Sequence, residues 1–452
     1  HREERDLIGK KQIPINALYG INTQRALENF NISNYKISNY PSLIKGFAII
    51  KKAAAQTNFS LDQLSKEKHD AIIEACDELY NGKYIDQFPI DLIQGGAGTS
   101  CNMNCNEVIS NIALLKLGHK PGEYKYCDPH DDINKCQSTN DAYPSACKFA
   151  IYLVNDNLEK SLTKLITELD KKKEEFKDIL KIGRTQLQDA VPMKLGDTFG
   201  AYASSMKEEI ISIKEASEKL LEINMGATAI GTGICCVPGF CEKIIENLRK
   251  NTGWDIKLSK DLIFATSDTG SMVNYSSALK KLSLRLIKIC NDLRLLSSGP
   301  RCGLEEISLP EMQSGSSIMP GKVNPVIPEV VNQVCYRVIG NDTTVMLSSG
   351  NSQLELNVFE PVMVFSILES ASMLTNAIET LATKCINGIK ANKEKCQEYI
   401  EKCVCIVTAF NHYIGYENGT KLSKEALETG KGIYELILEK KLLSKEQVDL
   451  IM

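Results

Sequence analysis

Residues Ser145–Ile182 read SACKFAIYLVNDNLEKSLTKLITELDKKKEEFKDILKI, a run of 38 residues that contains neither glycine nor proline. Apolar residues recur along this segment at spacings of three and four, which predicts an amphipathic α-helix. As one helix it would be ~57 Å long at ~1.5 Å per residue. Helices in globular proteins average about 11–12 residues. This segment therefore favours a fold in which long helices bury their apolar faces against one another.

Three other segments of the chain share this pattern. They are Ala201–Met225, Ser271–Ser298 and Val362–Asn387, with 25, 28 and 26 residues. In Ser271–Ser298 the leucines and isoleucines surround much of the helix circumference, so that helix needs partners on several sides. The sequence thus predicts an all-α fold whose central bundle of long helices takes part in oligomerisation.

Shorter helical patterns flank this centre on both sides. The expected helices are Ser42–Asn58, Leu61–Tyr80, Asn392–Ala409 and Lys421–Lys440, with a polar loop at His412–Gly419. We therefore predict three mainly helical domains: an N-terminal domain over residues 1–139, a central long-helix domain over 140–390, and a small C-terminal domain over 391–452.

The composition narrows the possible partners. The 452 residues carry a net charge of −4, with 43% hydrophobic and 24% charged residues, as is ordinary for a soluble protein. Such a mild charge gives no reason to expect nucleic acid or an anionic membrane as a partner. The N-terminus is charged and no run approaches 18 apolar residues, so we expect no signal peptide, no membrane span and a cytoplasmic location.

The sixteen cysteines do not form a recognisable metal or disulfide pattern. No Cys-x-x-Cys occurs, and the closest cysteine spacings lack a nearby histidine. We interpret these residues as reduced thiols that act as small buried apolar side chains. No His/carboxylate metal motif appears either, so no metal site is expected.

Four polar loops interrupt the helical background: Gly95–Ser100, Cys136–Asp141, Gly183–Asp189 and Gly315–Pro325. Each alone is typical of turns and helix caps, and the first matches neither nucleotide-binding fingerprint. Together they offer many neutral donors and one lysine, Lys322. That combination suits a small dicarboxylate, whose oxygens can be held by hydroxyl, amide and backbone N–H groups with one cation.

Histidine chemistry has little support in these loops. The chain has five histidines, and none of them lies in the four loops. A Ser-His-Asp triad therefore has no histidine near any candidate serine in the sequence, although the fold could still bring one close.

The run Gly315–Pro325, GSSIMPGKVNP, resembles the signature loop of the fumarase/aspartase superfamily. Further resemblance is found at Leu18–Thr23 with Arg25, Gln94–Ser100, Asn134–Asp141, Gly183–Pro192, Gly226–Gly233, Asn291–Gly303 and Val330–Thr344. Within the superfamily, Gln94–Thr99, Ser138–Asp141 and Asp189–Pro192 are similar to the aspartase branch. The resemblance implies a homotetramer in which three chains build each site, and a reaction that removes ammonia from L-aspartate to give fumarate.

The resemblance also implies a role for each site residue. Ser316 is matched to the general base that removes a proton from the carbon next to the β-carboxylate, which leaves an aci-carboxylate intermediate. The other matched residues are Thr99, Ser138, Thr139 and Ser317 for the β-carboxylate, Lys322, Asn324 and Thr185 for the α-carboxylate, and Asn140 for the departing amino group. No cofactor is required by this scheme, and activation by a divalent metal such as Mg is left open.

One departure from the superfamily pattern bears on the leaving group. Many members have histidine where this chain has Gln186, paired with a glutamate that matches Glu329. An amine leaves more readily than hydroxide, so Gln186 favours the loss of ammonia over the loss of water. Glu329 is then expected to stabilise the start of the following helix. The alternatives are a class II fumarase and, outside enzymes, a structural protein on the same scaffold, as crystallins related to argininosuccinate lyase illustrate.

Overall fold

The computed structural model describes residues 1–451, and helices hold 63% of the chain. The α-helices are α1 Ile21–Asn29, α2 Pro41–Ser60, α3 Lys66–Tyr80, α4 Thr99–Lys116, α5 Thr139–Glu175, α6 Leu195–Glu218, α7 Phe240–Thr252, α8 Leu262–Ser267, α9 Gly270–Leu296, α10 Val326–Gly350, α11 Glu360–Lys384, α12 Lys393–Lys402, α13 Val407–Ile414, α14 Tyr416–Thr429, α15 Ile433–Glu439 and α16 Lys445–Ile451. The short strands are β1 Arg2–Arg5, β2 Lys10–Ile13, β3 Leu180–Thr185, β4 Gln188–Lys194, β5 Glu222–Ile223, β6 Lys257–Leu258, β7 Ile307–Ser308 and β8 Lys390–Ala391. The predicted all-α class is confirmed.

The predicted long helices are present, with α9 and α11 close to their expected bounds. Helix α5 was predicted to start after Pro144, but it begins at Thr139 and encloses that proline. Proline has no N–H for the carbonyl of Asn140 four residues earlier. Instead, the Asn224 side-chain amide donates to that carbonyl at 3.1 Å, which leaves it satisfied. The first turn of α5 can therefore extend back into the loop that precedes the proline.

The predicted C-terminal end of α5 was wrong, because the chain leaves the helix at Glu175 and forms a hairpin. Strands β3 and β4 pair antiparallel, so the expected loop Gly183–Asp189 is the end of this hairpin. Its two tip residues, Gln186 and Leu187, have φ of 55° and 61°. Left-handed residues at both central positions give a turn whose twist matches that of the strands.

The loop predicted at His412–Gly419 was also wrong. Helix α13 continues to Ile414 and α14 begins at Tyr416, so only Gly415 separates the two helices. Its φ of 80° lies in the left-handed region, which glycine adopts without a steric penalty. One glycine thus turns the chain where a longer polar loop was expected.

The chain divides into two compact units. Unit 1 comprises residues 1–159, 211–283 and 336–374, and unit 2 comprises 160–210, 284–335 and 375–452. This division rests on packing between distant segments, so it follows different boundaries from the three predicted domains, which stay a prediction.

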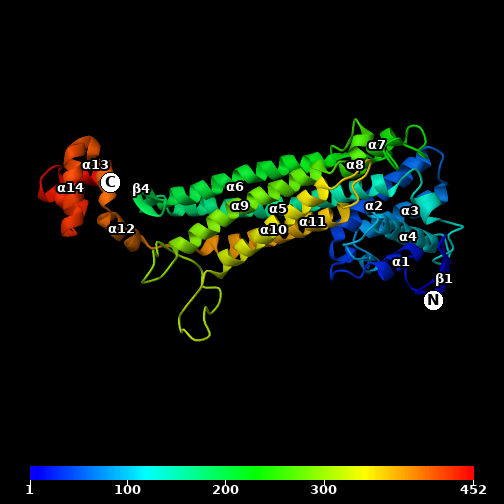
Figure 1. Cartoon of the computed structure of the whole chain (residues 1–452), viewed down its shortest axis with the longest axis horizontal. Coiled ribbons are helices and arrows are strands. Elements are labelled where there is room, and N and C mark those ends of the chain that lie inside the picture. The colour runs from blue at the N-terminus through cyan, green and yellow to red at the C-terminus, as the bar shows by residue number, and fades with distance from the viewer. Residues whose placement is uncertain (452) are drawn as a thin grey trace. The chain divides into compact units, whose positions relative to one another are not determined.

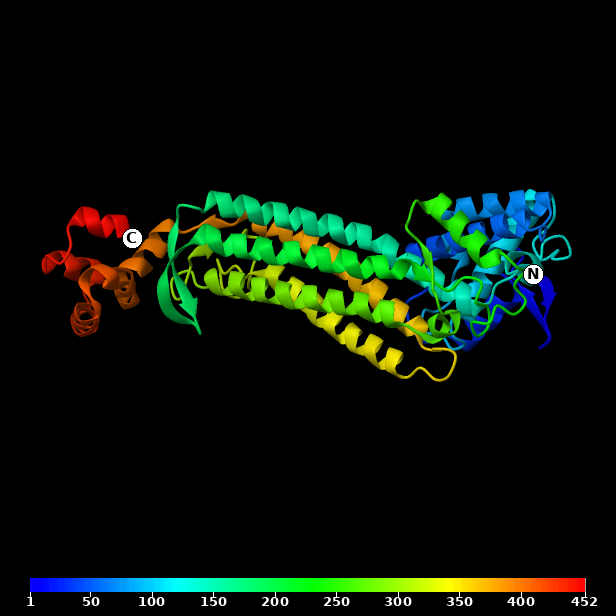
Figure 2. The same ribbon diagram turned by 90° about the horizontal axis from the view of Figure 1, so that it is seen from above.

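The five long helices, α5, α6, α9, α10 and α11, each have a segment in both units. Within each unit these segments pack alongside one another (Figures 1 and 2). In unit 1, Tyr275 of α9 donates to Asn155 of α5, and Ser276 of α9 donates to Asp342 of α10, both at 2.8 Å. In unit 2, Tyr202 of α6 donates to Asp292 of α9 at 2.8 Å. Such buried polar contacts between apolar helix faces fix the register of neighbouring helices.

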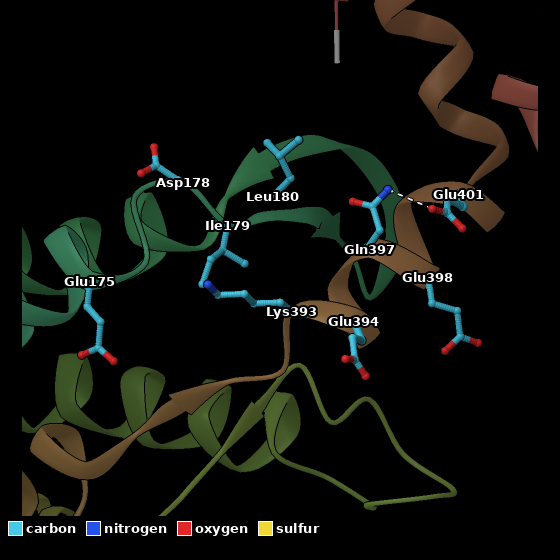
Figure 3. Close-up of a pocket in the computed structure, with 9 residues that line it drawn as sticks. All are labelled: Glu175, Asp178, Ile179, Leu180, Lys393, Glu394, Gln397, Glu398 and Glu401. Atoms are coloured by element: carbon cyan, nitrogen blue, oxygen red, sulfur yellow. Dashed lines mark hydrogen bonds between the residues drawn. The ribbon is translucent and has the colours of Figure 1, made fainter. Parts of the chain in front are cut away.

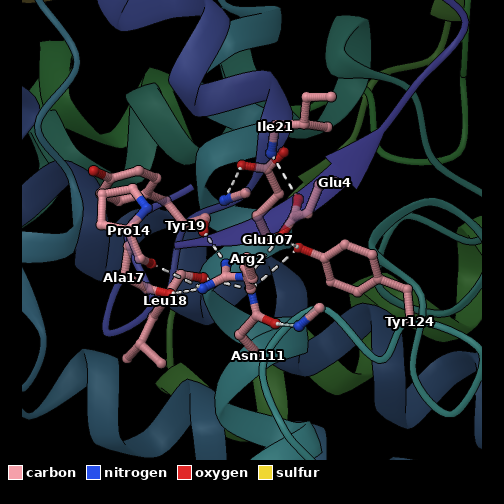
Figure 4. Close-up of polar contacts among 12 residues, drawn as sticks. Arg2, Glu4, Pro14, Ala17, Leu18, Tyr19, Ile21, Glu107, Asn111 and Tyr124 are labelled. Atoms are coloured by element: carbon pink, nitrogen blue, oxygen red, sulfur yellow. Dashed lines mark hydrogen bonds and ion pairs between the residues drawn. The ribbon is translucent and has the colours of Figure 1, made fainter. Parts of the chain in front are cut away.

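A carboxylate from α4 closes the N-terminal end of α1 (Figure 4). Gly20, the residue before α1, has no side chain that could cap the helix. The first N–H groups of α1 therefore need another acceptor. The buried Glu107 carboxylate accepts the backbone N–H groups of Gly20, Asn22 and Thr23. Glu4 of β1 accepts the N–H of Ile21 at 2.9 Å. The start of α1 is therefore held by two acidic side chains from other elements.

Helix α11 with the turn that follows it, Glu360–Gly388, is long and apolar enough to cross a membrane by length and composition. In this structure, 72% of its most apolar window is buried within the protein. A core helix passes the same test, so the composition of α11 does not indicate a membrane span.

Candidate active site

Thr99 is placed at the start of α4 by a left-handed turn. Gly96, Ala97 and Gly98 all have positive φ, and Thr99 is the first helical residue. A Cβ on Gly98 would lie 2.4 Å from the Tyr143 ring, so this position requires glycine both for its conformation and for space. The Thr99 side chain is exposed. The glycines thus present a hydroxyl at the N-terminal end of a helix.

Ser138 caps α5. Its hydroxyl oxygen accepts the N–H of Asn140 at 3.2 Å, and the Asp141 carboxylate accepts the N–H of Ser138 at 3.0 Å. The Ser138 hydroxyl thus satisfies an N–H of the first turn of α5, and Asp141 of that turn satisfies the N–H of Ser138 in return. The capping function expected of such loops is therefore present at Ser138, and its hydroxyl proton remains available for a bound oxygen.

Thr139 and Asn140 each keep one polar group available for a ligand. The Thr139 hydroxyl oxygen accepts from the Asn102 amide at 3.2 Å, so its proton can still be donated. The Asn140 amide nitrogen donates to the carbonyl of Ala229 at 2.7 Å, which fixes the orientation of the amide. Its carbonyl oxygen is then the group left to accept from an amine.

The unit 1 residues gather where two helices begin. Thr99 opens α4, Thr139 opens α5, and the Asn102–Thr139 hydrogen bond ties the two helix starts together. Helix N-termini carry partial positive charge and unsatisfied N–H groups. Two of them beside several hydroxyls form an environment that favours a carboxylate.

The loop that contains Ser316 closes on itself in unit 2. The N–H of Gly315 donates to the carbonyl of Lys322 at 2.8 Å, and the Asn324 side-chain amide donates to the carbonyl of Gly315 at 2.7 Å. A Cβ on Gly315 would lie 2.4 Å from the Lys322 carbonyl oxygen. Gly315 therefore permits the close approach of the two ends, and Asn324 acts here as the residue that joins them.

Two backbone amides point at the Ser316 hydroxyl oxygen. It accepts the N–H of Ile318 at 3.2 Å and the N–H of Met319 at 3.0 Å. The side chains of Ser317 and Lys322 are exposed, and within residues 1–451 neither makes a side-chain hydrogen bond or an ion pair. Donors aimed at an oxygen stabilise negative charge on it. The loop thus provides the surroundings that a serine alkoxide would need.

Thr185 and Gln186 lie at the exposed tip of the β3–β4 hairpin. Strand β3 of the hairpin is anchored by Glu306, which is fully buried. Glu306 accepts from Arg184 at 2.6 Å and lies 3.5 Å from the ammonium of Lys181. Two cations on β3 thus converge on one buried carboxylate, which fixes the direction in which the hairpin tip extends.

The matched residues fall into separate groups. Unit 1 brings together Thr99, Ser138, Thr139 and Asn140, whereas unit 2 holds the loop with Ser316, Ser317, Lys322 and Asn324 and the hairpin tip with Thr185 and Gln186. Glu329 lies in the first turn of α10, as expected. The assignment of these residues to a substrate stays a prediction.

The structure adds residues that the sequence interpretation did not assign. Asp141 is fully buried and accepts the N–H groups of Gly226 and Thr228 at 3.2 and 2.9 Å. Burial raises its pKa to about 6. The ammonium of Lys51 donates to the side-chain oxygens of Asn134 and Gln137, in the segment just before Ser138. Asn102, whose amide donates to the Thr139 hydroxyl oxygen, is a third such residue.

One pocket of unit 2 does not contain these residues (Figure 3). It is lined by Glu175, Asp178, Ile179, Leu180, Lys393, Glu394, Gln397, Glu398 and Glu401. Five of these side chains are acidic and one is basic, so the pocket repels a dicarboxylate. We therefore do not assign it to the substrate.

The thiols follow the interpretation made from the sequence in most positions. All sixteen cysteines are free, and eleven of them are buried. Cys101 and Cys136, which lie within three residues of Thr99 and Ser138, are 1% and 8% exposed. Within residues 1–451, no group of three or more His, Cys, Asp or Glu side chains is arranged to hold a metal ion.

Comparison with known proteins gives consistent matches along the chain. A family model described as Lyase matches residues 9–340, and one described as Fumarase C C-terminus matches residues 406–452. The aspartate ammonia-lyase of Escherichia coli (strain K12) is 53% identical over 449 residues, which cover 99% of this chain and 94% of that protein. The aspartate ammonia-lyase of Helicobacter pylori (strain ATCC 700392 / 26695) is 52% identical over 448 residues, with 99% and 96% covered.

Solved structures agree with these matches. The fumarate lyase:delta crystallin from Brucella melitensis bound to cobalt has a TM-score of 0.97 and 45% identity, covering 100% of this chain and 98% of that one. The recombinant class II fumarase from Schistosoma mansoni has a TM-score of 0.93 and 35% identity, covering 100% and 97%.

Proposed function

The chain belongs to the lyase family whose model spans residues 9–340, and from this membership we propose that it removes ammonia from L-aspartate to give fumarate. Relatives named aspartate ammonia-lyase, 53% and 52% identical over nearly the whole chain, support this activity over that of the fumarase, which is 35% identical. The substrate is accordingly a small dicarboxylate, and the reaction breaks a carbon–nitrogen bond.

Ser316 is the proposed general base. Its alkoxide takes a proton from the carbon next to the β-carboxylate, and the electron pair of that C–H bond moves into the carboxylate as an aci-carboxylate. The pair then forms the C=C bond of fumarate while the C–N bond of the protonated amino group breaks and its electron pair leaves with ammonia. The observation that best supports this role is the pair of backbone N–H groups, from Ile318 and Met319, on the Ser316 hydroxyl oxygen.

The remaining matched residues bind the parts of the substrate. The hydroxyls of Thr99, Ser138, Thr139 and Ser317 hold the β-carboxylate, and stabilise it as its charge increases in the aci-carboxylate. Lys322, Asn324 and Thr185 hold the α-carboxylate. The free carbonyl oxygen of Asn140 accepts from the departing amino group. Gln186 is uncharged, so it supplies no acid to the leaving group. This scheme uses no cofactor.

The active form is proposed to be a cytoplasmic homotetramer in which each site combines segments of three chains. Support for assembly comes from exposed apolar side chains along α10, where Tyr336, Met346 and Leu347 are 55%, 57% and 58% exposed. Apolar side chains concentrated on one helix face are typical of an interface. The sixteen free thiols agree with a reducing compartment.

The decisive experiment compares two substrates. The purified protein is incubated with L-aspartate or with L-malate at equal concentration, and fumarate is followed by its ultraviolet absorbance. We expect fumarate from L-aspartate and essentially none from L-malate. Equal or faster turnover of L-malate would replace the proposal with a fumarase, and no turnover of either substrate would leave only the structural alternative.

A further inference from the structure

A lysine is completely buried beneath the loop that carries three of the proposed substrate ligands. Lys51 of α2 is 1% exposed, and its ammonium donates to the side-chain oxygens of Asn134 at 3.0 Å and Gln137 at 2.9 Å. Among residues 1–451, no carboxylate forms an ion pair with it. A buried charge that contacts only neutral groups is costly to the fold. Such a cost is expected where the charge has a function.

The contacts of Lys51 lead directly to Thr139. Asn134 uses the same side-chain oxygen to accept from Asn102 at 3.1 Å, and Asn102 also donates to the Thr139 hydroxyl oxygen at 3.2 Å. Gln137 immediately precedes Ser138, and its amide nitrogen is fixed by the carbonyls of Ile133 and Lys135. The ammonium therefore holds both the turn before Ser138 and the amide that supports Thr139.

The surroundings of Lys51 act on its pKa in two opposite directions. Burial lowers its pKa to about 8, while Cys105 of α4, Asp141 of α5 and Cys76 of α3 act in the opposite direction. Asp141 accepts from the backbone of Ser138 at 3.0 Å, so it contacts the same loop. At neutral pH the protonated lysine thus adds positive charge below the hydroxyls that face the β-carboxylate.

We propose that Lys51 is a positioning residue that holds Ser138 and Thr139, through Gln137 and through Asn134 and Asn102, in the arrangement that stabilises the doubly charged aci-carboxylate. This inference rests on the proposed function. Positioning matters here because a displacement of about 1 Å can reduce a rate by about 10²-fold.

The test compares ligands that resemble two stages of the reaction. Succinate has the carboxylates of the ground state. The nitronate form of 3-nitropropionate carries two negative oxygens on an sp² group, as the aci-carboxylate does. Dissociation constants of both ligands are measured by calorimetry for the wild-type protein and for Lys51→Met, which keeps the unbranched shape of the side chain and most of its length without its charge. Lys52→Met is the matched control, because Lys52 is the next residue of α2 and pairs instead with Asp77.

We expect Lys51→Met to weaken nitronate binding at least about 10-fold more than succinate binding, and to lower kcat for L-aspartate more than it raises KM. Lys52→Met should change neither ratio. A loss of packing alone would weaken both ligands equally, and this outcome, or unchanged binding, would overturn the inference. Should Lys51→Met fail to fold, Gln137→Leu removes one acceptor of the same ammonium and must show the same preference in a smaller degree. If Gln137→Leu weakens nitronate and succinate binding equally, the inference is also overturned.

Failure of the proposed function would be recognised separately. Ligand binding is measured without turnover, so a wild-type protein that discriminates between the two ligands but does not deaminate L-aspartate contradicts the reaction and not the positioning. A protein that forms fumarate while Lys51→Met keeps its nitronate affinity contradicts only the positioning.

Discussion

Replacing Ser316 with alanine tests the proposed base most directly. A hydrogen bond to a charged group contributes about 1.5–3 kcal/mol, so the amides of Ile318 and Met319 together stabilise an alkoxide by about 3–6 kcal/mol. This corresponds to about 10²–10⁴ in the alkoxide population, the range by which general base catalysis accelerates reactions. We expect Ser316→Ala to lower kcat for L-aspartate by at least about 10²-fold.

The same variant should leave the fold unchanged. Ile318 and Met319 are 84% and 48% exposed, so water can replace the lost acceptor, and we expect a change of under ~1 kcal/mol in unfolding free energy. Fumarate formation measures the rate, and circular dichroism with sedimentation reports helical content and assembly. Ser314→Ala, an exposed serine in the same loop, is the matched control and should keep its activity. If Ser316→Ala retains a tenth or more of wild-type kcat, another residue is the base.

Three other predictions address the surroundings of the site. Glu306→Gln leaves Lys181 and Arg184 without their buried carboxylate, so we expect a loss of about 3–5 kcal/mol in unfolding free energy; an unchanged thermal midpoint would contradict the anchoring role. Thiol reagents should inactivate the protein more slowly when fumarate is bound, through modification of Cys136, whose pKa is lowered by a hydrogen bond from Cys236, whereas full activity after mass spectrometry confirms that modification would exclude this. A Cβ on Gly340 would meet no atom of another element within 4 Å, so we expect Gly340→Leu to disturb the proposed tetramer and not the fold, with smaller species in sedimentation; an unchanged assembly would exclude this position of α10 from the interface.

The long helices could be predicted because their signal is repetitive. Helices α9 and α11 lie in segments where each turn adds apolar residues and no glycine or proline interrupts. The end of α5 could not be predicted in this way, because the hairpin after it depends on contacts with Glu306, more than 100 residues away in the sequence. A local pattern cannot represent that partner.

The candidate site shows the same division between local and distant information. The interactions of Ser316 and Ser138 involve residues two or three positions away, so the loop sequences carried them. The burial of Lys51 could not be predicted from the sequence. Lys51 and Lys52 are adjacent, and each has apolar residues four positions before and three positions after it: Phe47 and Ala54 for Lys51, Ala48 and Ala55 for Lys52. Which lysine faces inward, and its acceptors Asn134 and Gln137, could be identified only from coordinates.

The cap on α1 has a consequence for the order in which the protein matures. Helix α1 obtains its cap from Glu107, 87 residues after Gly20, and this carboxylate leaves the ribosome well after α1 itself. At a synthesis rate of about 5–20 residues per second, several seconds separate the two. During that interval the N–H groups of Gly20, Asn22 and Thr23 depend on water. Helix α1 is therefore made before the element, α4, that completes its final contacts.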